Sequence, residues 1–382
     1  MSYKLPLRKV FFLPNIAGGI SSVLKQLVSD SDLVVLIQNE KSNVLEVHPS
    51  NYFGCETKIF TYKTKENLYY ISLRLARLIK SKFEIIVAND WLELEMCARM
   101  ALKNPVIHIV HGDYSYYYQL AINYQKSINK WLGVSEYITE SIKSAIQPRV
   151  KDISYMPIGV DVESTTFNVR KERSLLKIIF AGRLTEQKGF FDIFKIDEIL
   201  KKRNILIEWT IAGENTQVNL SNYPKNFTFV GKVSNLFLMD LFTKNHVLIL
   251  PSRAEGFPVT LIEAMKLGLI PLITNFKSGI PEVVVNSENG FLFDIGDFEG
   301  YANAIEKINF DYAFFNLLRK NAVEAVCNKF TSLIQQNVFN FVINELDDNY
   351  LGRKSYKNWG SRLDIKWIPD FIVRNARTII NK

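Results

Sequence analysis

The chain has 382 residues, which is too long for one ordinary core, and its composition, 47% hydrophobic and 23% charged, is that of a soluble globular protein. Its net charge of +8 is uneven: residues 1–165 have 19 basic and 16 acidic side chains, residues 166–347 have 20 of each, and residues 348–382 have 8 and 3. The excess therefore belongs mainly to a tail, which argues against a nucleic-acid-binding face on the body of the protein.

The first half of the sequence alternates short apolar runs with segments of helical length such as residues 67–82. Nearly continuous apolar strands separated by helices predict a parallel sheet covered on both faces. The expected strands are residues 9–14, 32–38, 58–62, 83–90, 105–112 and 130–135.

The second half repeats this alternation, with strands expected at residues 175–184, 207–214, 226–231, 246–252, 269–274 and 290–293. Residues 163–174 between the halves are polar and aperiodic, which indicates a linker. We therefore expect an α/β protein with two Rossmann-like, doubly wound domains, residues 1–165 and 166–347, followed by a basic and aromatic tail, residues 348–382. The active site is expected in a cleft between the two domains, at the carboxyl ends of their strands.

The cysteines and the apolar runs of the sequence bear on metal binding and on cellular location. Three widely spaced cysteines argue against a disulfide framework or a zinc site and indicate reduced thiols in a cytoplasm. No apolar run approaches the ~20 residues that span a bilayer. The apolar stretch before Pro14 is too short for a signal peptide, so a cytoplasmic location is expected.

A pair of cations follows the first strand of the second half, in the segment AGRLTEQKGFFD. Arg183 and Lys188 lie just before an expected helix, and two cations beside a helix amino terminus favour binding of an anion such as a diphosphate. The alternative is that both are ordinary surface charges of a loop.

The segment SRAEGFPVTLIEAM, residues 252–265, has the same layout one unit later. Pro258 suits the first turn of a helix and Gly256 allows a ligand to approach the backbone closely. Free N–H groups of that first turn can hold phosphate oxygens. They belong to Phe257, Val259 and Thr260, whereas Pro258 has no N–H to donate.

Two carboxylates, Glu255 and Glu263, flank this turn. Each can accept hydrogen bonds from vicinal sugar hydroxyls. The alternative is that Glu255 complements the helix start and Glu263 is a solvated helix residue. The apolar neighbours of Glu263 on both sides argue against a solvated face.

Taken in order, these motifs resemble the GT-B family of retaining glycosyltransferases often called family 4. The matching segments are AGRLTEQKG, TIAGE, FVGKV, LPSRAEGFPVTLIEAMKLGLIPLIT and GIPEVV with ENGFLF, preceded by the weaker matches IAGGISSVL, VHGD, GVSEYITESI and PIGVD. Together they extend from about residue 9 to residue 347. The Glu-x7-Glu element of the family corresponds to Glu255 and Glu263.

The resemblance implies a role for each matching residue of the second half. Arg183 and Lys188 would grip the diphosphate of the donor and stabilise its departing charge. Glu255 would contact the transferred sugar, and Glu263 would accept hydrogen bonds from the ribose hydroxyls. The backbone near Phe257, Val259 and Thr260 would cradle phosphate, and the GKV segment ending at Val233 would lie beside the nucleobase. Many relatives have glycine where this chain has Pro258, which removes one backbone donor from that cradle.

In the first half the resemblance assigns donor contacts to Gly18, Gly19 and His111. The two glycines match a loop that closes over the phosphates and the acceptor, although by themselves they indicate only a tight turn. His111 matches a histidine at a strand end near the donor sugar, although a lone histidine after an apolar strand is often structural.

The resemblance implies transfer of a sugar from a nucleotide-diphospho-sugar to a glycan or lipid-linked hydroxyl with retention. The lysine- and isoleucine-rich composition is typical of a bacterial protein, so we expect a role in surface polysaccharide synthesis such as that of lipopolysaccharide, O-antigen or capsule. With two cations on the leaving group, no metal or other cofactor is expected. The alternatives are a sugar-nucleotide epimerase or a phosphorylase on the same fold, and a non-catalytic sugar-nucleotide-binding protein. A nicotinamide dehydrogenase is disfavoured because no G-x-G-x-x-G follows the first strand.

Two segments bear on the acceptor. Four tyrosines, Tyr114 and residues 116–118, follow His111 and can either stack on sugar rings or pack beneath the loop. The tail, residues 348–382, mixes basic residues with tryptophan, phenylalanine and isoleucine, a composition that suits an anionic membrane surface. Alternatively, part of the tail packs on the first domain. A peripheral position at the inner face of the plasma membrane is therefore one expectation.

Overall fold

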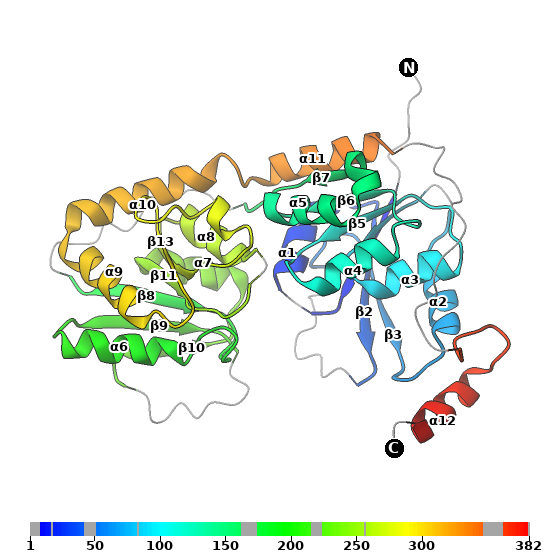
Figure 1. Ribbon diagram of the computed structural model, residues 1–382, viewed down its shortest axis with the longest axis horizontal. Helices are drawn as coiled ribbons and strands as arrows, with labels where there is room; N and C mark the ends of the chain where they lie inside the picture. The colour runs from blue at the N-terminus through cyan, green and yellow to red at the C-terminus, as the bar shows by residue number, and fades with distance from the viewer. Residues whose placement is uncertain are drawn as a thin grey trace. The chain divides into compact units, whose positions relative to one another are not determined.

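A computed structural model of the chain describes two compact units (Figure 1). Unit 1 comprises Met1–Pro157 and Gln335–Lys382, and unit 2 comprises Ile158–Ile334. The chain thus returns to unit 1 before the tail begins, and most of the expected linker, residues 163–173, lies outside the described residues. The structure describes residues 8–16, 18–41, 51–81, 84–161, 174–214, 224–255, 257–346 and 362–380.

Unit 1 contains a seven-stranded, fully parallel sheet with the order β3-β2-β1-β4-β5-β6-β7. Its central strands are buried along their whole length because both faces are covered. The strands are β1 (Lys9–Pro14), β2 (Leu33–Asn39), β3 (Glu56–Tyr62), β4 (Ile85–Ala88), β5 (Val106–Val110), β6 (Lys130–Gly133) and β7 (Ile153–Tyr155).

Three helices of unit 1 begin at polar residues whose side chains accept hydrogen bonds from first-turn N–H groups. Ser135 accepts from the backbone of Ile138, and Asp90 forms a capping box with Glu93. The helices are α1 (Gly19–Lys25), α2 (Leu68–Ala76), α3 (Trp91–Arg99), α4 (Ser115–Asn123), α5 (Glu136–Ala145), η1 (Gln147–Asp152), α11 (Ser332–Asn344) and α12 (Asp370–Ile380).

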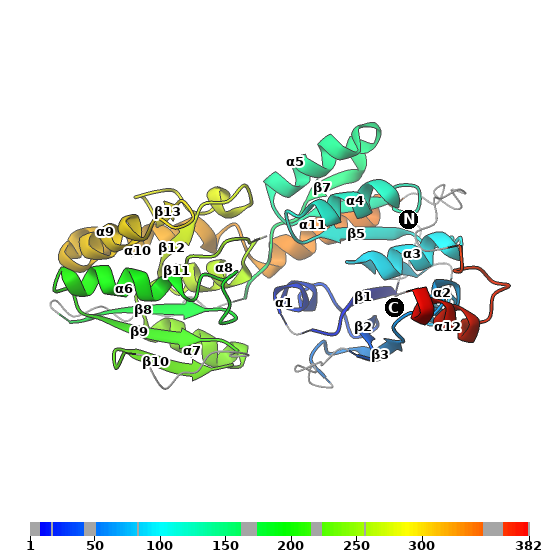
Figure 2. The same ribbon diagram turned by 60° about the horizontal axis from the view of Figure 1, so that its bottom comes forward.

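The carboxyl-terminal part of the chain packs on unit 1. The ring of Phe339 in α11 lies 6.2 Å from that of Phe11 in β1. Further along, Asp370 accepts a hydrogen bond from the backbone N–H of Asn67 at 2.8 Å, and Val373 is fully buried. The start of helix α12 therefore lies next to the start of α2 (Figures 1 and 2). Within the described residues, no helix has an apolar run long enough to cross a bilayer.

Unit 2 contains a six-stranded parallel sheet with the order β10-β9-β8-β11-β12-β13. Its strands are β8 (Leu176–Ala181), β9 (Ile207–Ala212), β10 (Phe227–Gly231), β11 (Val247–Leu250), β12 (Ile270–Thr274) and β13 (Phe291–Phe293). Its helices are α6 (Asp192–Lys202), α7 (Asn235–Lys244), α8 (Val259–Lys266), η3 (Ile280–Glu282), α9 (Phe298–Phe310) and α10 (Tyr312–Cys327). Helix α6 packs with α9, and α8 packs with α7 and α10.

The two sheets confirm the predicted fold of two doubly wound α/β domains, and all twelve expected strands are present. One described strand, β7, was not predicted, because its three residues at the sheet edge are too few to form a pattern. In each sheet the strand order reverses once, between β1 and β4 in unit 1 and between β8 and β11 in unit 2. Ligands of such sheets bind beyond the carboxyl ends of the strands at this reversal.

Candidate active site

The loops that follow β8 and β11 bring Lys188 and Glu255 into contact. Lys188 Nζ donates to both carboxylate oxygens of Glu255, at 2.8 and 2.7 Å, and Ser252 Oγ donates to Oε1 at 2.7 Å. The loops approach closely at Gly189, where φ is +70° and a Cβ atom would lie 1.9 Å from the carbonyl oxygen of Pro251. Only glycine fits there, so the Lys-Gly sequence itself allows this ion pair.

Arg253 connects the same two loops by hydrogen bonds. The sequence analysis assigned no role to this residue. Its backbone N–H donates to the carbonyl oxygen of Gln187 at 2.8 Å, and its guanidinium contacts Asp192 at 2.8 Å. The Asp192 side chain is 3% exposed and that of Arg253 is 33% exposed, so the carboxylate is buried while the guanidinium still reaches water. Arg253 therefore positions the segment that contains Lys188. The sequence feature that could have predicted this role is a cation next to Ser252 at the end of a strand.

Arg183 lies two residues after β8 and is exposed. Its side chain makes no hydrogen bond or ion pair with any other residue that the structure describes. The preceding Gly182 packs against Gly213, where a Cβ atom would lie 1.8 Å from the Gly182 carbonyl oxygen. Arg183 is thus a cation at the strand reversal whose donors are available to an anion.

Helix α8 begins where the sequence predicts, with Pro258 as its extended N-cap residue. Val259 and Thr260 form its first turn, whose N–H groups have no acceptor within the helix. The Phe257 side chain is buried and stacks on Phe330 at 5.8 Å, so Phe257 can offer a ligand only its backbone. Gly256 lies outside the described residues.

Glu263 is buried in the second turn of α8 and not on a solvated face, with 7% of its surface exposed. Asn235, the first residue of α7, donates its amide to Glu263 Oε1 at 3.0 Å. Burial raises the pKa of the Glu263 carboxyl, and the Asn235 hydrogen bond opposes that shift. Val233, half-buried, lies just before α7 in the loop that reaches Glu263.

In unit 1, His111 follows β5 and has one defined tautomer. Its Nε2 lies 2.7 Å from Asn89 Oδ1, and Asn89 Nδ2 donates to the carbonyl oxygen of Phe12 at 2.6 Å. Because a carbonyl oxygen can only accept, the Asn89 amide is fixed and His111 Nε2 must donate the proton. Burial lowers the pKa of His111 to about 3, so the ring is neutral and its Nδ1 is an acceptor.

A carboxyl pair lies next to Asn89 at the start of α3. Glu93 Oε1 accepts from the backbone N–H groups of Asn89 and Asp90, at 2.8 and 2.6 Å. Burial, followed by the nearby Asp90 charge, raises the pKa of Glu93 to about 8. Asp90 accepts hydrogen bonds from the Trp91 backbone and the Tyr116 hydroxyl. Of the clustered tyrosines, Tyr116 thus contacts Asp90 while the residue remains 40% exposed.

The remaining predicted residues, Gly18 and Gly19, form the start of α1. Gly18 has an extended backbone with φ of 170°, and a Cβ atom there would meet no described atom within 4 Å. Packing within the described chain therefore does not require glycine at this position. His111, Gly18 and Gly19 belong to unit 1, and all the other predicted site residues belong to unit 2.

Residues 162–325, which contain Arg183, Lys188, Glu255 and Glu263, match the family model described as glycosyl transferases group 1. The likeness to this family therefore lies in the part of the chain that contains the candidate donor site. The match covers most of unit 2 and ends before the chain returns to unit 1.

Curated relatives extend the similarity toward the amino terminus. A glycogen synthase of Mycobacterium tuberculosis is 24% identical over 67% of this chain and 68% of its own length. An Escherichia coli UDP-Gal:alpha-D-GlcNAc-diphosphoundecaprenol alpha-1,3-galactosyltransferase is 23% identical over 84% of this chain and 80% of its own. The capsular polysaccharide biosynthesis glycosyltransferase CapM of Staphylococcus aureus is 28% identical over 41% of this chain and 42% of its own. Together with the family match, these relatives indicate that the chain is a transferase enzyme.

A solved structure supports the fold independently. HepE of Anabaena, in complex with UDP and glucose, superposes with a TM-score of 0.71 over 89% of this chain and 100% of its own, at 17% identity. The two Rossmann-like sheets and this likeness confirm the predicted GT-B fold class.

Proposed function

We propose that the protein transfers a sugar from a nucleotide-diphospho-sugar to a hydroxyl acceptor with retention of the anomeric configuration, as a family 4 enzyme. One observation carries the proposal: two cations lie beyond β8 at the strand reversal of unit 2, and the second is held by Glu255. Lys188 uses two of its three N–H donors on that carboxylate, and Arg183 uses none on the described chain. Donors therefore remain for a diphosphate.

The two cations should contribute most to catalysis at the leaving group. As the glycosidic bond breaks, negative charge grows on the departing phosphate, and fixed cations that strengthen their contacts at that point lower the barrier. Arg183 and Lys188 fill this role in the proposal. A bound metal would then be unnecessary, and we expect transfer to continue in excess EDTA; loss of transfer that Mg²⁺ restores would contradict this.

The other residues of unit 2 hold the donor in place. Glu255, oriented by Lys188 and Ser252, would accept hydrogen bonds from hydroxyls of the transferred sugar. Glu263 Oε2, which has no partner in the described part of the chain, would accept from the ribose. Backbone N–H groups at Phe257 and in the first turn of α8, at Val259 and Thr260, would bind phosphate oxygens, and Val233 would line the nucleobase site.

Unit 1 would contribute His111 and the glycine pair. His111 Nδ1 is an acceptor in the tautomer fixed by Asn89, so a sugar hydroxyl can donate to it. Gly18 and Gly19 would let a loop backbone approach the substrates closely, which explains glycine where packing does not demand it.

Retention is proposed to follow same-face attack, with the leaving phosphate accepting the proton of the acceptor hydroxyl. Glu255 is engaged by three donors in the structure, which favours a binding role over that of a free nucleophile. The test is a screen of nucleotide sugars by thermal shift, followed by NMR of the transfer product. A donor at 100 times its Kd should add about 2.7 kcal/mol. An inverted product, or an epimerised donor without acceptor, would overturn the proposal.

The acceptor is proposed to be a glycan or lipid-linked sugar in bacterial surface polysaccharide synthesis. The relatives support this by their names, which include a capsular polysaccharide enzyme and one that acts on a diphosphoundecaprenol-linked sugar. Transfer to a synthetic undecaprenyl-diphospho-sugar, compared with the free sugar, tests the lipid-linked part.

We also propose that the tail holds the enzyme at an anionic membrane. While Val373 packs inward, Trp367, Phe371 and Ile379 of the same segment are 80%, 59% and 74% exposed. Residues 348–382 have 8 basic and 3 acidic side chains, a charge that anionic lipids attract. Vesicles with phosphatidylglycerol should sediment the protein, and Phe371→Ser with Trp367→Ser should release it without changing its unfolding temperature. Equal sedimentation with neutral vesicles would contradict the proposal.

A further inference from the structure

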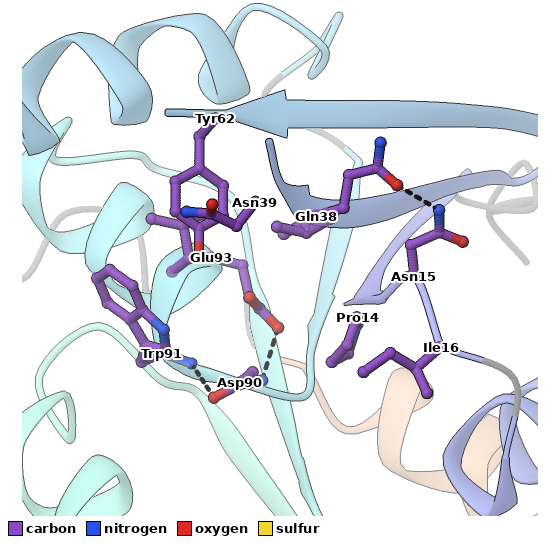
Figure 3. Close-up of a pocket in the computed structure, with 11 residues that line it drawn as sticks. Pro14, Asn15, Ile16, Gln38, Asn39, Tyr62, Asp90, Trp91 and Glu93 are labelled. Carbon is purple, nitrogen blue, oxygen red and sulfur yellow. Dashed lines mark hydrogen bonds between the residues drawn. The ribbon is translucent and has the colours of Figure 1, made fainter. Parts of the chain in front are cut away.

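Unit 1 contains a cavity of about 250 Å³ to which the proposed roles assign no ligand (Figure 3). It lies where the first four strands end: Pro14 ends β1, Asn39 ends β2, Tyr62 ends β3, and Asp90 follows β4. The β1/β4 strand reversal, where doubly wound sheets bind ligands, is part of its wall. Its volume suits one small ring and not an extended chain, because ligand pockets of about 300–1,000 Å³ hold drug-sized molecules.

The lining combines ring faces with a few polar groups. Figure 3 shows Trp91, Tyr62 and Asn39 on one side of the cavity and Pro14 and Ile16 on the other, with the Glu93 carboxyl group between them. Flat aromatic faces stack against the C–H faces of sugar rings, and placed polar groups then select among hydroxyls. The lining therefore fits a carbohydrate better than a wholly apolar ligand.

At least two of the polar groups have hydrogen-bonding capacity left. Asn39 Oδ1 accepts from the Lys41 backbone and the Thr64 hydroxyl, both at 2.9 Å, which orients the amide and leaves its N–H groups without a partner in the described chain. Glu93 Oε1 accepts two backbone N–H groups, and Oε2 accepts none from the residues described. One donor group and one carboxyl oxygen are thus available at the cavity wall.

The charge of the lining restricts the ligand further. Among the described residues that line the cavity, none is lysine, arginine or histidine, and the two titratable acids are Asp90 and Glu93. Burial, with the Asp90 charge as a smaller cause, raises the pKa of Glu93 to about 8, so Glu93 keeps its proton at neutral pH. A phosphate or carboxylate on the ligand would meet Asp90 with no compensating cation.

We propose that this cavity binds one uncharged sugar ring of the acceptor and excludes phosphorylated and acidic sugars. The identification with the acceptor rests on the proposed function, whereas the selection for an uncharged ring rests on the lining alone. The cavity also shares its wall with the residues that position His111, because Asp90 follows Asn89 directly and Glu93 binds the backbone of both.

The test is saturation-transfer NMR of the full chain with methyl glycosides of glucose, galactose, mannose and N-acetylglucosamine, and with glucose 6-phosphate and glucuronic acid. At least one neutral glycoside should bind, with at least tenfold higher affinity than either acid. Trp91→Ala should weaken that binding at least tenfold, while Trp367→Ala, at an 80%-exposed tryptophan of the same unit, should leave it unchanged. Ile16→Lys adds a cation at an exposed lining position and should admit glucose 6-phosphate.

If Trp91→Ala does not fold, Asn39→Asp provides the test, because aspartate keeps the Oδ1 acceptor and removes the N–H donors. We expect its affinity for the neutral glycoside to be about fivefold lower. The proposal is overturned if no neutral glycoside binds, if the acids bind equally well, or if both tryptophan variants behave alike. Failure of the proposed function looks different. In that case nucleotide sugars produce no thermal shift or transfer, while neutral glycosides still bind in a Trp91-dependent way.

Discussion

Replacing Lys188 by methionine removes the ammonium group and retains a flexible side chain of similar length. The change deletes the contacts of 2.8 and 2.7 Å to Glu255, whose side chain is only 9% exposed and keeps the Ser252 hydroxyl as its donor among the described residues. Breaking a fully buried ion pair costs about 3–5 kcal/mol, because the remaining charge is unpaired. Since the Lys188 side chain is 24% exposed, water already weakens the pair, and we expect about 2–3 kcal/mol.

In a domain of the size of unit 2 this corresponds to a fall of about 4–12 °C in unfolding temperature. Glu255→Gln should cost less, about 1 kcal/mol, because the remaining Lys188 ammonium reaches water. The double variant leaves no unpaired carboxylate, so it should be more stable than the two single losses imply, by about 1–2 kcal/mol.

Calorimetry at pH 7.5 measures these unfolding temperatures, and a transfer assay with the identified nucleotide sugar measures catalysis. Each of the three variants should lose about 100-fold or more in kcat, including the double variant whose stability is partly restored. Strict additivity of the unfolding free energies would refute the unpaired-charge reasoning. Transfer by Lys188→Met within tenfold of the parent would refute its role at the leaving group.

Three further predictions concern the same unit. Arg183→Ala should change the unfolding free energy by less than about 0.5 kcal/mol, because Arg183 is exposed, yet lower kcat/KM by roughly 150-fold, or about 3 kcal/mol; near-normal turnover would contradict this. Glu263→Gln should weaken UDP binding about 10- to 100-fold in calorimetric titration. Burial raises the pKa of Glu263 in the folded state, so the parent protein loses stability as pH rises above the pKa of Glu263 in the unfolded state. The Glu263→Gln variant should therefore have a higher free energy of unfolding than the parent at pH 8 and an equal one at pH 4. The same difference between the two proteins at both pH values would contradict the raised pKa. Arg253→Met leaves the buried Asp192 with only Lys195, at 3.2 Å, as an ion-pair partner among the described residues. The variant should therefore lower the free energy of unfolding by about 1 kcal/mol and raise the KM for the donor, and an unchanged KM would show that Arg253 does not position the Lys188 loop.

Strand positions could be predicted from the sequence because parallel strands buried on both faces need continuous apolar runs. Such runs are local, and β4 and β5 are buried at every residue. β7 was missed because three residues at an edge bury too little to require a pattern. The packing of α11 on unit 1 could not be predicted from the sequence either, because an apolar helix face does not specify which hydrophobic core it packs against.

The charged residues at strand ends could also be predicted, since polar groups after buried strands must lie at one edge of a sheet. Their partners could not. Lys188 and Glu255 were each assigned to a ligand, and the structure shows that they bind each other across 67 residues of sequence. Arg253 and Ser252 were overlooked because their roles depend on a neighbouring loop that the strand order brings close.

The sequence by itself therefore determined the fold class, the two sheets and the composition of the candidate donor site, because apolar periodicity and strand-end chemistry are properties of short segments. Only the tertiary structure decided the Lys188–Glu255 pair, the burial of Glu263 against Asn235 and the tautomer of His111. Each of these depends on contacts between residues distant in sequence. Those contacts follow from strand order and from the close approach of backbones at Gly189, which no local pattern encodes.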